Sequence, residues 1–567
     1  MRITRLQTTN FRNLPNLDVA LGRNTVVVGE NKSGKSNLVR ALRLVLDPTL
    51  PATERRLTTD DFWDGLAQGR LGYDPMEDKQ VIEVAVEIDD FEEDERLLAV
   101  LSGGLISMEP MRARLTYRWA PDATKGDAYR DGVYFGADGA GTRVGSDLRD
   151  ELFVAFLHAL RDVENDIRSW RKSPLRVLLD AAIEKLSTDQ LESIRESLRS
   201  SNDELQAMDP IATIGTKIAQ LMASSVGSRQ SLETSLRSTP QDPQRIIRSM
   251  QLYVDGDSAR PLGATSLGAQ NVLYFTLLKL GFAQQLEDKA VSHTVILAEE
   301  PEAHLHPQVQ RSLLHSLRSD EDASSLLVTT HSPHIASATD ARDLVRLNPS
   351  AEGTTAWAAS SAGLSEPEWD DINRYLDATR AEMVFASRVL LVEGYGEQVV
   401  VPALARQLGL DLDHEGITVC AIHGTHFKSF VKFCDALGIA WAVLTDGDID
   451  GAGVSQGSLR VAALQTELGL EGPPEENGLF MGPDTLEVDL YRLEANRVPM
   501  ESVLKELGSV HAANRIAAWN GTPTKEQLIG EVRNAGGKGR VNQRLADASL
   551  HPPLHVAAAL EYLGGLS

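Results

Sequence analysis

A phosphate-binding loop near the start of the chain constrains the fold more than any other feature. The apolar run Thr25–Val28 leads directly into a segment with the spacing G-x-x-x-x-G-K-S. Glycines in such a segment let main-chain N–H groups turn toward phosphates, and a helix that begins there adds the positive end of its dipole. The sequence therefore predicts a strand, a loop and a helix that bind a nucleoside triphosphate. The predicted nucleotide contacts are Gly29, Asn31, Lys32, Ser33, Gly34, Lys35, Ser36 and Asn37.

Two residues of this loop have specific roles in the prediction. Lys35 is expected to reach the β- and γ-phosphates, and the hydroxyl of Ser36 is expected to bind Mg²⁺. A glycine-rich turn without a ligand is the alternative. The apolar strand before the loop and the predicted helix Asn37–Leu46 after it supply the context that a nucleotide site requires, and they favour the first interpretation.

A second apolar strand carries acids at its end. Thr294–Ala298 is followed by Glu299 and Glu300. Glu299 is expected to support the Mg²⁺ shell, and Glu300 is the candidate general base that orients the attacking water. A strand that ends in a polar turn is the alternative. His331 follows the apolar run Ser325–Thr329 and is a candidate sensor of the γ-phosphate, although a lone histidine in such a place is more often structural.

The start of another predicted helix forms a weaker anion site. Ser266 and Gly268 precede the buried helical pattern Ala269–Leu280. Main-chain N–H groups at a helix N-terminus attract phosphate, so both residues are candidate nucleotide contacts. A helix that Ser266 caps without any ligand is the alternative, and the pattern leaves both interpretations open.

A second set of acids lies far downstream. The strand pattern Val389–Val392 ends at Glu393, and Glu397 is expected on the first turn of the following helix. Another strand pattern, Ala442–Thr445, is followed by acids two residues apart, whose side chains point the same way in an extended chain. Paired carboxylates hold cations on the attacking and leaving oxygens in two-metal phosphodiester chemistry, and oxygen ligands suit Mg²⁺ or Mn²⁺. The predicted metal ligands are Glu393, Glu397, Asp446, Asp448 and Asp450.

Composition limits the class of protein. The net charge of −25 argues against a surface coated for DNA binding, but a local basic groove is compatible with it. The two cysteines give no disulfide framework. The sequence contains no apolar run long enough to span a membrane, and its N-terminus has no apolar signal core, so a cytoplasmic protein is expected.

Strand and helix patterns divide the chain into segments. Half-buried strands dominate the beginning, helical spacing dominates the middle, and strand patterns then return. The helical middle is expected to be either a dimerisation arm or an internal helical layer of the ATPase. The predicted boundaries are 1–150 for the first part of the ATPase, 151–240 for the helical insertion, 241–378 for the second part of the ATPase, and 379–567 for a second α/β unit with a helical tail.

Individual elements are predicted from local periodicity. Alternating strands are expected at Arg2–Thr9, Val81–Ile88 and Arg112–Trp119. A further strand is expected at Ile246–Val254. A helix at Arg374–Phe385 is expected to connect the two α/β units.

The order of the motifs resembles the ATP-binding-cassette (ABC) ATPases, in the branch that contains RecF, Rad50 and SMC proteins. Asn10–Asn13 before the loop, Ser266–Gly268 before the acidic strand, and the run Glu299–Pro307 look like that branch. The resemblance implies that two ATPase heads sandwich ATP. It also implies that Ser266 contacts the γ-phosphate across the dimer.

The downstream acids resemble a different domain. Glu393 with its following glycine, together with Asp446 and Asp448, is similar to the Toprim domain of topoisomerases, primases and some nucleases. That domain is a small Rossmann-like α/β sheet, which presents such acids from parallel strands. An ATPase of the RecF, Rad50 and SMC branch followed by a Toprim domain resembles the OLD (overcoming lysogenization defect) family of nucleases over nearly the whole chain.

The OLD resemblance adds residues that the strand patterns do not single out. It implies that Glu487 is a further metal ligand and that Lys538 stabilises the scissile phosphate. A solvated lysine in a flexible loop is the alternative for Lys538. The family often has a pair of glycines where this chain has His423 and Gly424, and this difference leaves the local loop shape open.

The resemblance also implies a function. OLD family members are Mg²⁺- or Mn²⁺-dependent DNA endonucleases with an ATPase domain, and several act in anti-phage defence. The layout resembles the Gabija-type nuclease, which is encoded beside a UvrD-like helicase. DNA, such a helicase, and further copies of this chain in a dimer or tetramer are therefore the implied partners.

A protein without nuclease activity is the alternative. It would be an ATP-gated DNA-binding protein or a topoisomerase-like protein. Topoisomerase chemistry needs a tyrosine nucleophile on a DNA-binding domain, and no segment of this sequence resembles such a domain. The intact set of acids favours cleavage.

Overall fold

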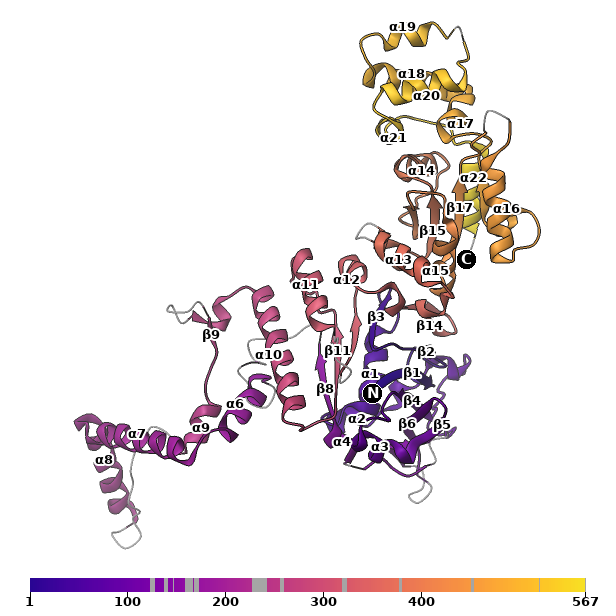
Figure 1. Cartoon of the computed structure of the whole chain (residues 1–567). Coiled ribbons are helices and arrows are strands. Elements are labelled where there is room, and N and C mark those ends of the chain that lie inside the picture. Colours follow the sequence, from indigo (N-terminus) through magenta and orange to yellow (C-terminus); the bar gives the residue numbers. More distant parts are fainter. Residues whose placement is uncertain are drawn as a thin grey trace.

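The computed structural model has an N-terminal body, a C-terminal body and a helical arm (Figure 1). The N-terminal body contains the strands β1 to β14, and the C-terminal body runs from β15 to α22. The arm leaves the N-terminal body on the side away from the C-terminal body. The structure describes residues 1–122, 128–136, 141–145, 147–158, 167, 173–226, 242–254, 260–318, 324–376, 380–449, 453–519 and 521–565.

An antiparallel sheet begins the N-terminal body. Its strands follow the order β2-β1-β4-β6-β5, and β7 also pairs with β6. The three alternating strands predicted for this region are confirmed, and their inward side chains, such as Leu6 and Val84, are fully buried. The strands are β1 (Arg2–Thr9), β2 (Asp18–Ala20), β4 (Ile82–Asp89), β5 (Leu105–Met108), β6 (Met111–Pro121) and β7 (Tyr129–Phe135).

A mostly parallel sheet forms the centre of this body. Its strand order is β14-β13-β3-β12-β11-β8, and the neighbouring pairs from β13 to β8 run parallel. β3 lies inside the sheet, so Val26, Val27 and Val28 are buried on both faces. The strands are β3 (Asn24–Gly29), β8 (Leu152–Leu157), β11 (His293–Glu299), β12 (Ser324–Thr329), β13 (Leu344–Ser350) and β14 (Gly353–Ala358).

Helices cover the two sheets and complete an ABC-type ATPase fold, as the sequence predicts. α1 follows the phosphate-binding loop, and its buried face, which includes Leu38 and Leu42, packs into the core that the sheets share. The helices of this body are α1 (Lys35–Leu46), α2 (Ala52–Arg55), α3 (Glu95–Leu101), α4 (Asp147–Glu151), α10 (Leu267–Glu287), α11 (Pro307–Leu317), α12 (Pro333–Ala338) and α13 (Glu366–Tyr375), and α9 (Pro243–Arg248) lies in the arm.

The predicted start of the helical insertion is corrected by the structure. Helices are expected from residue 151 onward, but Leu152–Leu157 form β8 and pair in parallel with β11. A short apolar run is compatible with a buried strand or a buried helix, so periodicity alone does not separate the two. The sheet of the ATPase therefore includes the first residues of the segment assigned to the insertion.

The strand predicted at Ile246–Val254 is wrong over most of its length. The segment begins within α9, because Asp242 caps this helix by accepting a hydrogen bond from the N–H of Gln244, and a proline follows the cap. The end of the segment is extended and forms β9 (Tyr253–Val254), which pairs with β10 (Arg260–Pro261).

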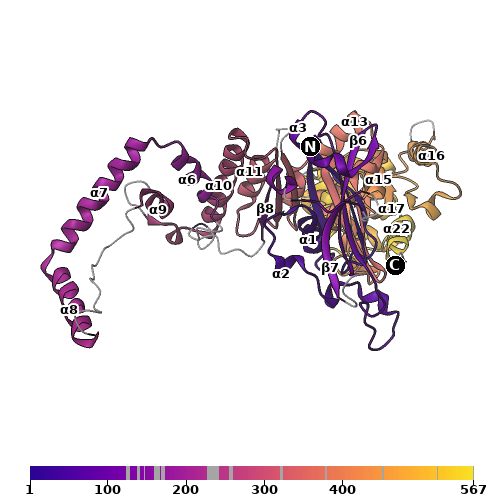
Figure 2. The same ribbon diagram turned by 90° about the horizontal axis from the view of Figure 1, so that it is seen from below.

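The helical spacing in the middle of the chain is confirmed. α6 (Leu175–Glu184), α7 (Thr188–Ala207) and α8 (Asp209–Val226) form the arm, and Figure 2 shows α7 and α8 projecting from the body. α7 begins with a capping box between Ser187 and Gln190. None of the described helices is long and apolar enough to cross a membrane.

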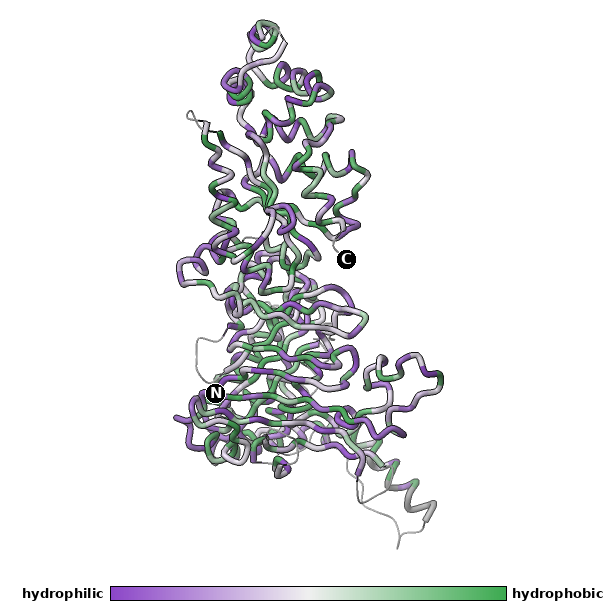
Figure 3. Tube along the Cα trace, turned by 90° about the vertical axis from the view of Figure 1, so that its right-hand side faces the viewer, coloured by the Kyte–Doolittle hydropathy of each residue, from purple (hydrophilic) through white to green (hydrophobic). Residues whose placement is uncertain are grey.

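The C-terminal body contains a parallel sheet of the predicted Rossmann-like kind. The strand order is β16-β15-β17-β18, and the neighbouring strands run parallel. Apolar residues concentrate inside both bodies along the chain trace in Figure 3. The strands are β15 (Arg388–Val392), β16 (Ile417–Ala421), β17 (Ala440–Thr445) and β18 (Leu479–Met481).

Helices flank this sheet and then build a tail beyond it. α21 packs against α14, and α22 returns to the sheet beside β17 and β18. Figure 1 shows α18, α19 and α20 at the end of the molecule farthest from the N-terminal body. The helices are α14 (Tyr395–Gln407), α15 (Phe427–Ala436), α16 (Gln456–Leu468), α17 (Leu486–Arg492), α18 (Glu494–Leu507), α19 (Ala512–Ala517), α20 (Lys525–Asn534), α21 (Lys538–Leu545) and α22 (Leu554–Gly565).

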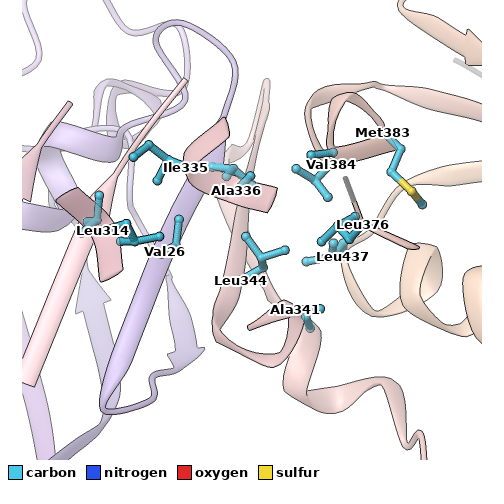
Figure 4. Packing of buried hydrophobic residues seen from close by; sticks show 14 of the residues in the cluster. Val26, Leu314, Ile335, Ala336, Ala341, Leu344, Leu376, Met383, Val384 and Leu437 are labelled. Carbon is cyan, nitrogen blue, oxygen red and sulfur yellow. The ribbon is translucent and has the colours of Figure 1, made fainter. Parts of the chain in front are cut away.

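The two bodies share one hydrophobic core. Figure 4 shows Ala336 and Leu344 of the N-terminal body facing Leu376, Val384 and Leu437. The continuous helix predicted at Arg374–Phe385 is wrong. α13 ends before Leu376, whose side chain is buried in the shared core, and a separate 3-10 helix begins at residue 380.

A buried arginine fixes the contact between the bodies. Arg346 of β13 is 4% exposed, and its guanidinium donates to the main-chain oxygens of Ala386 at 2.7 Å and Gly438 at 3.1 Å. Asn348 also donates to the oxygen of Gly438 at 3.0 Å. β13 is the immediate neighbour of β3, so the strand that carries the phosphate-binding loop is one strand away from this contact.

Candidate functional site

The phosphate-binding loop has the strand–loop–helix geometry that its sequence predicts. β3 ends at Gly29, and Gly34 adopts a left-handed conformation (φ 96°) at the N-terminus of α1. A β-carbon at Gly34 would lie 2.5 Å from the side-chain nitrogen of Asn13, so the glycine is required there. Asn13 and Arg12 also hold the side chain of Asn37, and the predicted nucleotide contact of Asn37 stays a prediction.

Lys35 lies at the centre of this loop. Its side chain is almost fully buried, and Nζ donates to the main-chain oxygens of Gly29 at 2.8 Å and Glu30 at 2.9 Å. Burial lowers the pKa of Lys35, although nearby acids, chiefly Glu300 and Glu302, oppose that shift. Nucleotide phosphates would therefore replace main-chain oxygens as the partners of this lysine. Ser33 is buried beneath the loop, whereas Asn31 and Lys32 are exposed.

The predicted Mg²⁺ partners of the nucleotide are adjacent. Burial raises the pKa of Glu299, and a hydrogen bond with the side chain of Ser36 opposes this rise. The two residues come from the ends of β11 and the start of α1, which meet at the carboxyl edge of the parallel sheet. The structure thus brings together the hydroxyl and the carboxylate expected to support one cation.

Glu300 and His331 are also brought together, at the ends of β11 and β12. His331 Nε2 lies 3.7 Å from Glu300 Oε1. Burial lowers the pKa of His331, and the positive charge of Lys35 lowers it further. A neutral imidazole beside the candidate base and Lys35 fits the proposed contact with a γ-phosphate.

The sequence reasoning did not assign a role to Glu302. This half-buried carboxylate accepts hydrogen bonds from Thr330 Oγ1 at 2.6 Å and from the N–H of His331 at 3.0 Å. Burial raises its pKa. Glu302 therefore positions the main chain that carries His331. Its place in the run from Glu299 to Pro307 was the available signal.

The Ser266 motif forms a helix cap within this chain. Ser266 Oγ accepts a hydrogen bond from the N–H of Ala269 at 3.2 Å. A β-carbon at Gly268 would lie 2.9 Å from the main-chain oxygen of His304, so glycine allows α10 to approach the loop after β11. The predicted contact of Ser266 and Gly268 with a nucleotide on another copy stays a prediction.

The downstream acids gather at the carboxyl edge of the C-terminal sheet. Glu393 follows β15 and Asp446 follows β17, and these strands are parallel neighbours. Glu393 Oε1 accepts from the N–H of Asp446 at 2.9 Å, and Asp446 Oδ1 accepts from the N–H of Leu486 at 3.0 Å. The latter contact brings in α17 and with it Glu487, which is fully buried. We call Glu393, Glu397, Asp446, Asp448 and Glu487 the carboxylate site.

Lys538 reaches this site from the start of α21. Its Nζ lies 3.2 Å from Asp446 Oδ2 and 3.2 Å from Glu487 Oε2. Burial lowers the pKa of Lys538, but Glu487 and Asp446 outweigh this effect and the net shift is upward. The lysine is therefore a charged partner of the acids.

Burial disfavours the charged forms of two of these acids, Asp446 and Glu397. Burial raises the pKa of Asp446 to about 8, although Lys538 opposes the rise. Burial and the charge of Glu487 raise the pKa of Glu397 to about 7. Such a cluster favours an added cation, because a cation relieves the repulsion between carboxylates.

The sequence reasoning missed Arg460, which lies on the other side of the carboxylate site. Its Nη2 contacts Asp448 Oδ2 at 2.8 Å and Glu393 Oε1 at 3.3 Å. Nothing in the periodicity of α16 distinguishes this arginine from the others in the chain. Asp450, the remaining predicted ligand, lies outside the described residues.

The donor set of the carboxylate site fits a hard divalent cation. In the part of the chain that the structure describes, no three histidine, cysteine or acidic side chains are arranged to hold a metal by themselves. Lys538 and Arg460 stand between the acids instead. Among the described residues, the partner of the buried Glu487 Oε2 is Lys538, whose Nζ lies 3.2 Å away as an ion pair. An all-oxygen set with such an acceptor suits Mg²⁺ or Mn²⁺.

The position at which OLD proteins often have glycine is explained by the backbone. His423 adopts a left-handed conformation with φ 54°, which glycine adopts without strain. The N–H of the next residue, Gly424, donates to the main-chain oxygen of Glu393 at 3.0 Å. The loop thus keeps a glycine-like shape and supports the turn that carries Glu393.

Comparisons with known proteins also find an ATPase domain and a TOPRIM domain in this chain. Residues 384–448 match the family described as overcoming lysogenization defect protein-like, TOPRIM domain, and residues 153–336 match an AAA ATPase domain. The OLD nuclease of Thermus scotoductus is 29% identical over 472 residues, which cover 79% of this chain and 82% of that protein. The endonuclease GajA of Bacillus cereus is 22% identical over 493 residues, which cover 83% of this chain and 79% of that protein.

A solved structure is similar to part of the chain. It is the C-terminal region of the Burkholderia pseudomallei OLD protein, which is 30% identical and has a TM-score of 0.29, with 32% of this chain and 98% of that chain covered. The TOPRIM match includes Glu393, Glu397, Asp446 and Asp448, and the ATPase match runs from β8 to α12. The chain thus has an ATPase domain followed by an OLD-like TOPRIM domain, and in this order of domains it is similar to the overcoming lysogenization defect (OLD) proteins.

Proposed function

We propose that the chain is a divalent-metal-dependent DNA endonuclease that is regulated by ATP. The main support is structural: acids that follow β15 and β17, and an acid of α17, converge with Lys538 at one edge of the C-terminal sheet. Two proteins that are similar to this chain over most of its length are named OLD nuclease and endonuclease GajA. Their names supply the reaction class, and the carboxylate site supplies the chemical means.

The acids of the carboxylate site and Lys538 would have different roles in phosphodiester hydrolysis. Mg²⁺ or Mn²⁺, when bound, activates water and neutralises charge that develops on the phosphate oxygens. Glu393, Glu397, Asp446, Asp448 and Glu487 would hold the cations, and Asp450 is a further proposed ligand. Lys538 carries a positive charge into the same site and would stabilise the scissile phosphate.

The nucleotide site would bind and hydrolyse ATP. Lys35 would bind the phosphates, Ser36 and Glu299 would support the cation of the nucleotide, and Glu300 would orient the attacking water beside His331. We propose that Ser266 and Gly268 complete this site on another copy of the chain. Figures 1 and 2 show α10 on the side of β8, away from α1, which follows the phosphate-binding loop of the same copy.

The arm would join copies of the chain in a dimer or tetramer. Ile214 and Ile218 lie four residues apart on α8 and are 51% and 37% exposed, and Met208 before α8 is 51% exposed. Residues at this spacing share one face of a helix. An apolar face that projects from the body in Figure 2 fits contact with a second copy.

The regulation by ATP would pass through the contact between the two bodies. Ser387 Oγ at the start of the C-terminal body donates to Glu30 Oε1 of the phosphate-binding loop at 3.0 Å. A cavity of about 270 Å³ lies beside the loop and is lined by Gly29, His331 and the 3-10 helix residues Glu382 and Phe385. Changes at the loop therefore have a direct physical route to the second body. Metal-assisted hydrolysis needs no energy from ATP, so nucleotide would control access rather than drive cleavage.

The cellular role is proposed from the family resemblance alone. We propose that the protein cleaves DNA in anti-phage defence and that a UvrD-like helicase is a candidate partner.

Supercoiled plasmid tests the proposed reaction. Incubation with Mn²⁺, with and without ATP, is expected to give nicked and linear DNA whose amount responds to ATP. The same reaction with EDTA is expected to give none. Relaxed topoisomers without nicked or linear DNA would instead support the topoisomerase-like alternative, and unchanged plasmid under all conditions would contradict the nuclease.

A further inference from the structure

Two cationic side chains sit among the acids of the carboxylate site, and each has its own set of oxygens. Lys538 Nζ contacts Asp446 Oδ2 and Glu487 Oε2. Arg460 contacts Glu393 and Asp448 on the other side. The acids are therefore divided into two groups by the side chains of the protein itself.

The contacts of Arg460 converge on one nitrogen. Its Nη2 lies 2.7 Å from the main-chain oxygen of Asp446, 2.8 Å from Asp448 Oδ2 and 3.3 Å from Glu393 Oε1. These oxygens come from the ends of two neighbouring strands, β15 and β17. Two carboxylates and a main-chain oxygen are ligands that Mg²⁺ and Mn²⁺ take in proteins. A positively charged nitrogen thus occupies a cage of oxygens suited to a divalent cation.

We propose that Arg460 holds the place of a metal ion between Glu393 and Asp448, and that metal binding at this position displaces its guanidinium. The inference rests on the proposed metal-dependent function. A guanidinium and a divalent cation compete for the same oxygens, and two positive charges that close together repel strongly. Each cation that binds here must therefore replace the contacts of Arg460.

A cavity beside the cage has room for the displaced side chain. It measures about 380 Å³ and is lined by Arg460 itself and, on its other walls, by Thr445, Glu368 and Glu467. Both of these glutamates now pair with Lys428, at 3.3 Å and 3.8 Å. The displaced guanidinium would find carboxylate partners there, since a single ammonium does not use all the acceptor sites of two carboxylates.

Calorimetric titration of metal tests this competition without using activity. Mn²⁺ is titrated into the full-length wild type and into Arg460→Met, which keeps an apolar stem but removes the charge and the N–H donors. Charged hydrogen bonds of this kind are worth enough that their loss is expected to tighten one Mn²⁺-binding step by about tenfold or more. The matched control is Arg540→Met, which removes an exposed arginine two residues from Lys538 and is expected to leave Mn²⁺ affinity unchanged.

Thermal unfolding gives an independent readout. In EDTA, Arg460→Met is expected to melt below the wild type, because Glu393 and Asp448 lose their cationic partner. Mn²⁺ is then expected to raise its melting temperature by more than it raises that of the wild type, since tighter binding to the folded state gives a larger shift. Arg460→Gln is the second variant if the methionine variant does not fold, and the same direction of change is expected.

The outcomes separate this inference from the proposed function. One outcome would overturn the role of Arg460 alone. In it, the wild type binds Mn²⁺, Asp446→Asn does not, and both Arg460 variants bind Mn²⁺ no more tightly than the wild type. Absence of Mn²⁺ binding in the wild type would instead overturn the metal-dependent function and this inference with it.

Discussion

The nucleotide site and the carboxylate site occupy the same place in two different sheets, yet they balance charge in different ways. Each lies at the carboxyl edge of parallel strands and contains a buried or half-buried lysine. Lys35 contacts main-chain oxygens of its own loop, whereas Lys538 contacts the carboxylates of Asp446 and Glu487. The phosphate-binding loop is thus arranged to receive an anion. The carboxylate site is arranged to receive cations, and the side chains of Lys538 and Arg460 supply positive charge there.

The largest expected effect separates the two sites completely. Asp446→Ala removes an acid that contacts Lys538 and anchors α17. We expect DNA cleavage in Mg²⁺ to fall by more than about 100-fold, because each protein ligand of such a cation matters, while ATP hydrolysis stays near the wild-type rate. A plasmid nicking assay and a phosphate-release assay on the same preparation measure both.

The matched control for this variant is Asp547→Ala, which removes an exposed acid from the same body. It is expected to leave both activities unchanged. If Asp446→Ala cleaves DNA at the wild-type rate, Asp446 is not a required metal ligand. If the variant loses DNA cleavage and ATP hydrolysis together, the two sites do not act separately.

The next effect divides roles within the nucleotide site. Lys35→Ala removes the cationic contact and is expected to abolish measurable ATP binding. Glu300→Gln keeps the shape of the side chain but not its basicity. This variant should bind ATP with near-normal affinity, and its rate of ATP hydrolysis should fall by about 100-fold or more. Calorimetry with ATP and steady-state hydrolysis distinguish these outcomes. Equal loss of ATP affinity in both variants would contradict the separate roles.

The nucleotide site was easier to predict from the sequence than the carboxylate site. The phosphate-binding loop is contiguous, and its glycines, lysine and serine act through local backbone geometry. Glu393 and Asp446 were also predictable, because each follows an apolar strand. Glu487 and Lys538 have no local signal of this kind, and only the resemblance to OLD proteins singled them out.

Residues that act through tertiary packing escaped prediction. Arg460 resembles any arginine on a half-exposed helix until α16 is placed beside β17. Arg346 is buried only because two bodies meet around it. β8 was missed because a run of apolar residues has no distinctive period. In each case the local pattern was compatible with two structures, and contacts distant in sequence decided between them.

A third test asks whether only one of the two sites needs a second copy of the chain. Ile214→Asp with Ile218→Asp places charges on the apolar face of α8. If the arm joins copies, light scattering is expected to show dissociation, and ATP hydrolysis is expected to fall about tenfold or more while Mn²⁺ affinity of the carboxylate site is kept. Ser200→Asp, on the exposed surface of α7, is the matched control and should retain the wild-type mass. Unchanged mass in the double variant would remove this face from the interface.

The smallest expected effect concerns the contact through which the two sites would communicate. Ser387→Ala removes the hydrogen bond to Glu30 of the phosphate-binding loop without touching the acids or Lys35. The bond lies on an exposed surface and joins a hydroxyl to a carboxylate, so its loss should weaken coupling by about 1 kcal/mol. Cleavage without ATP is expected to remain at the wild-type rate, whereas the change that ATP causes should shrink by up to about fivefold. Cleavage is measured over a series of ATP concentrations. Ser361→Ala is the control, because the hydroxyl of Ser361 donates to the main-chain oxygen of Ala358 within its own turn. An ATP response identical to that of the wild type would show that the Glu30 contact does not transmit the nucleotide state. The contacts of Arg346 and Asn348 with the C-terminal body would then be the next connections to test.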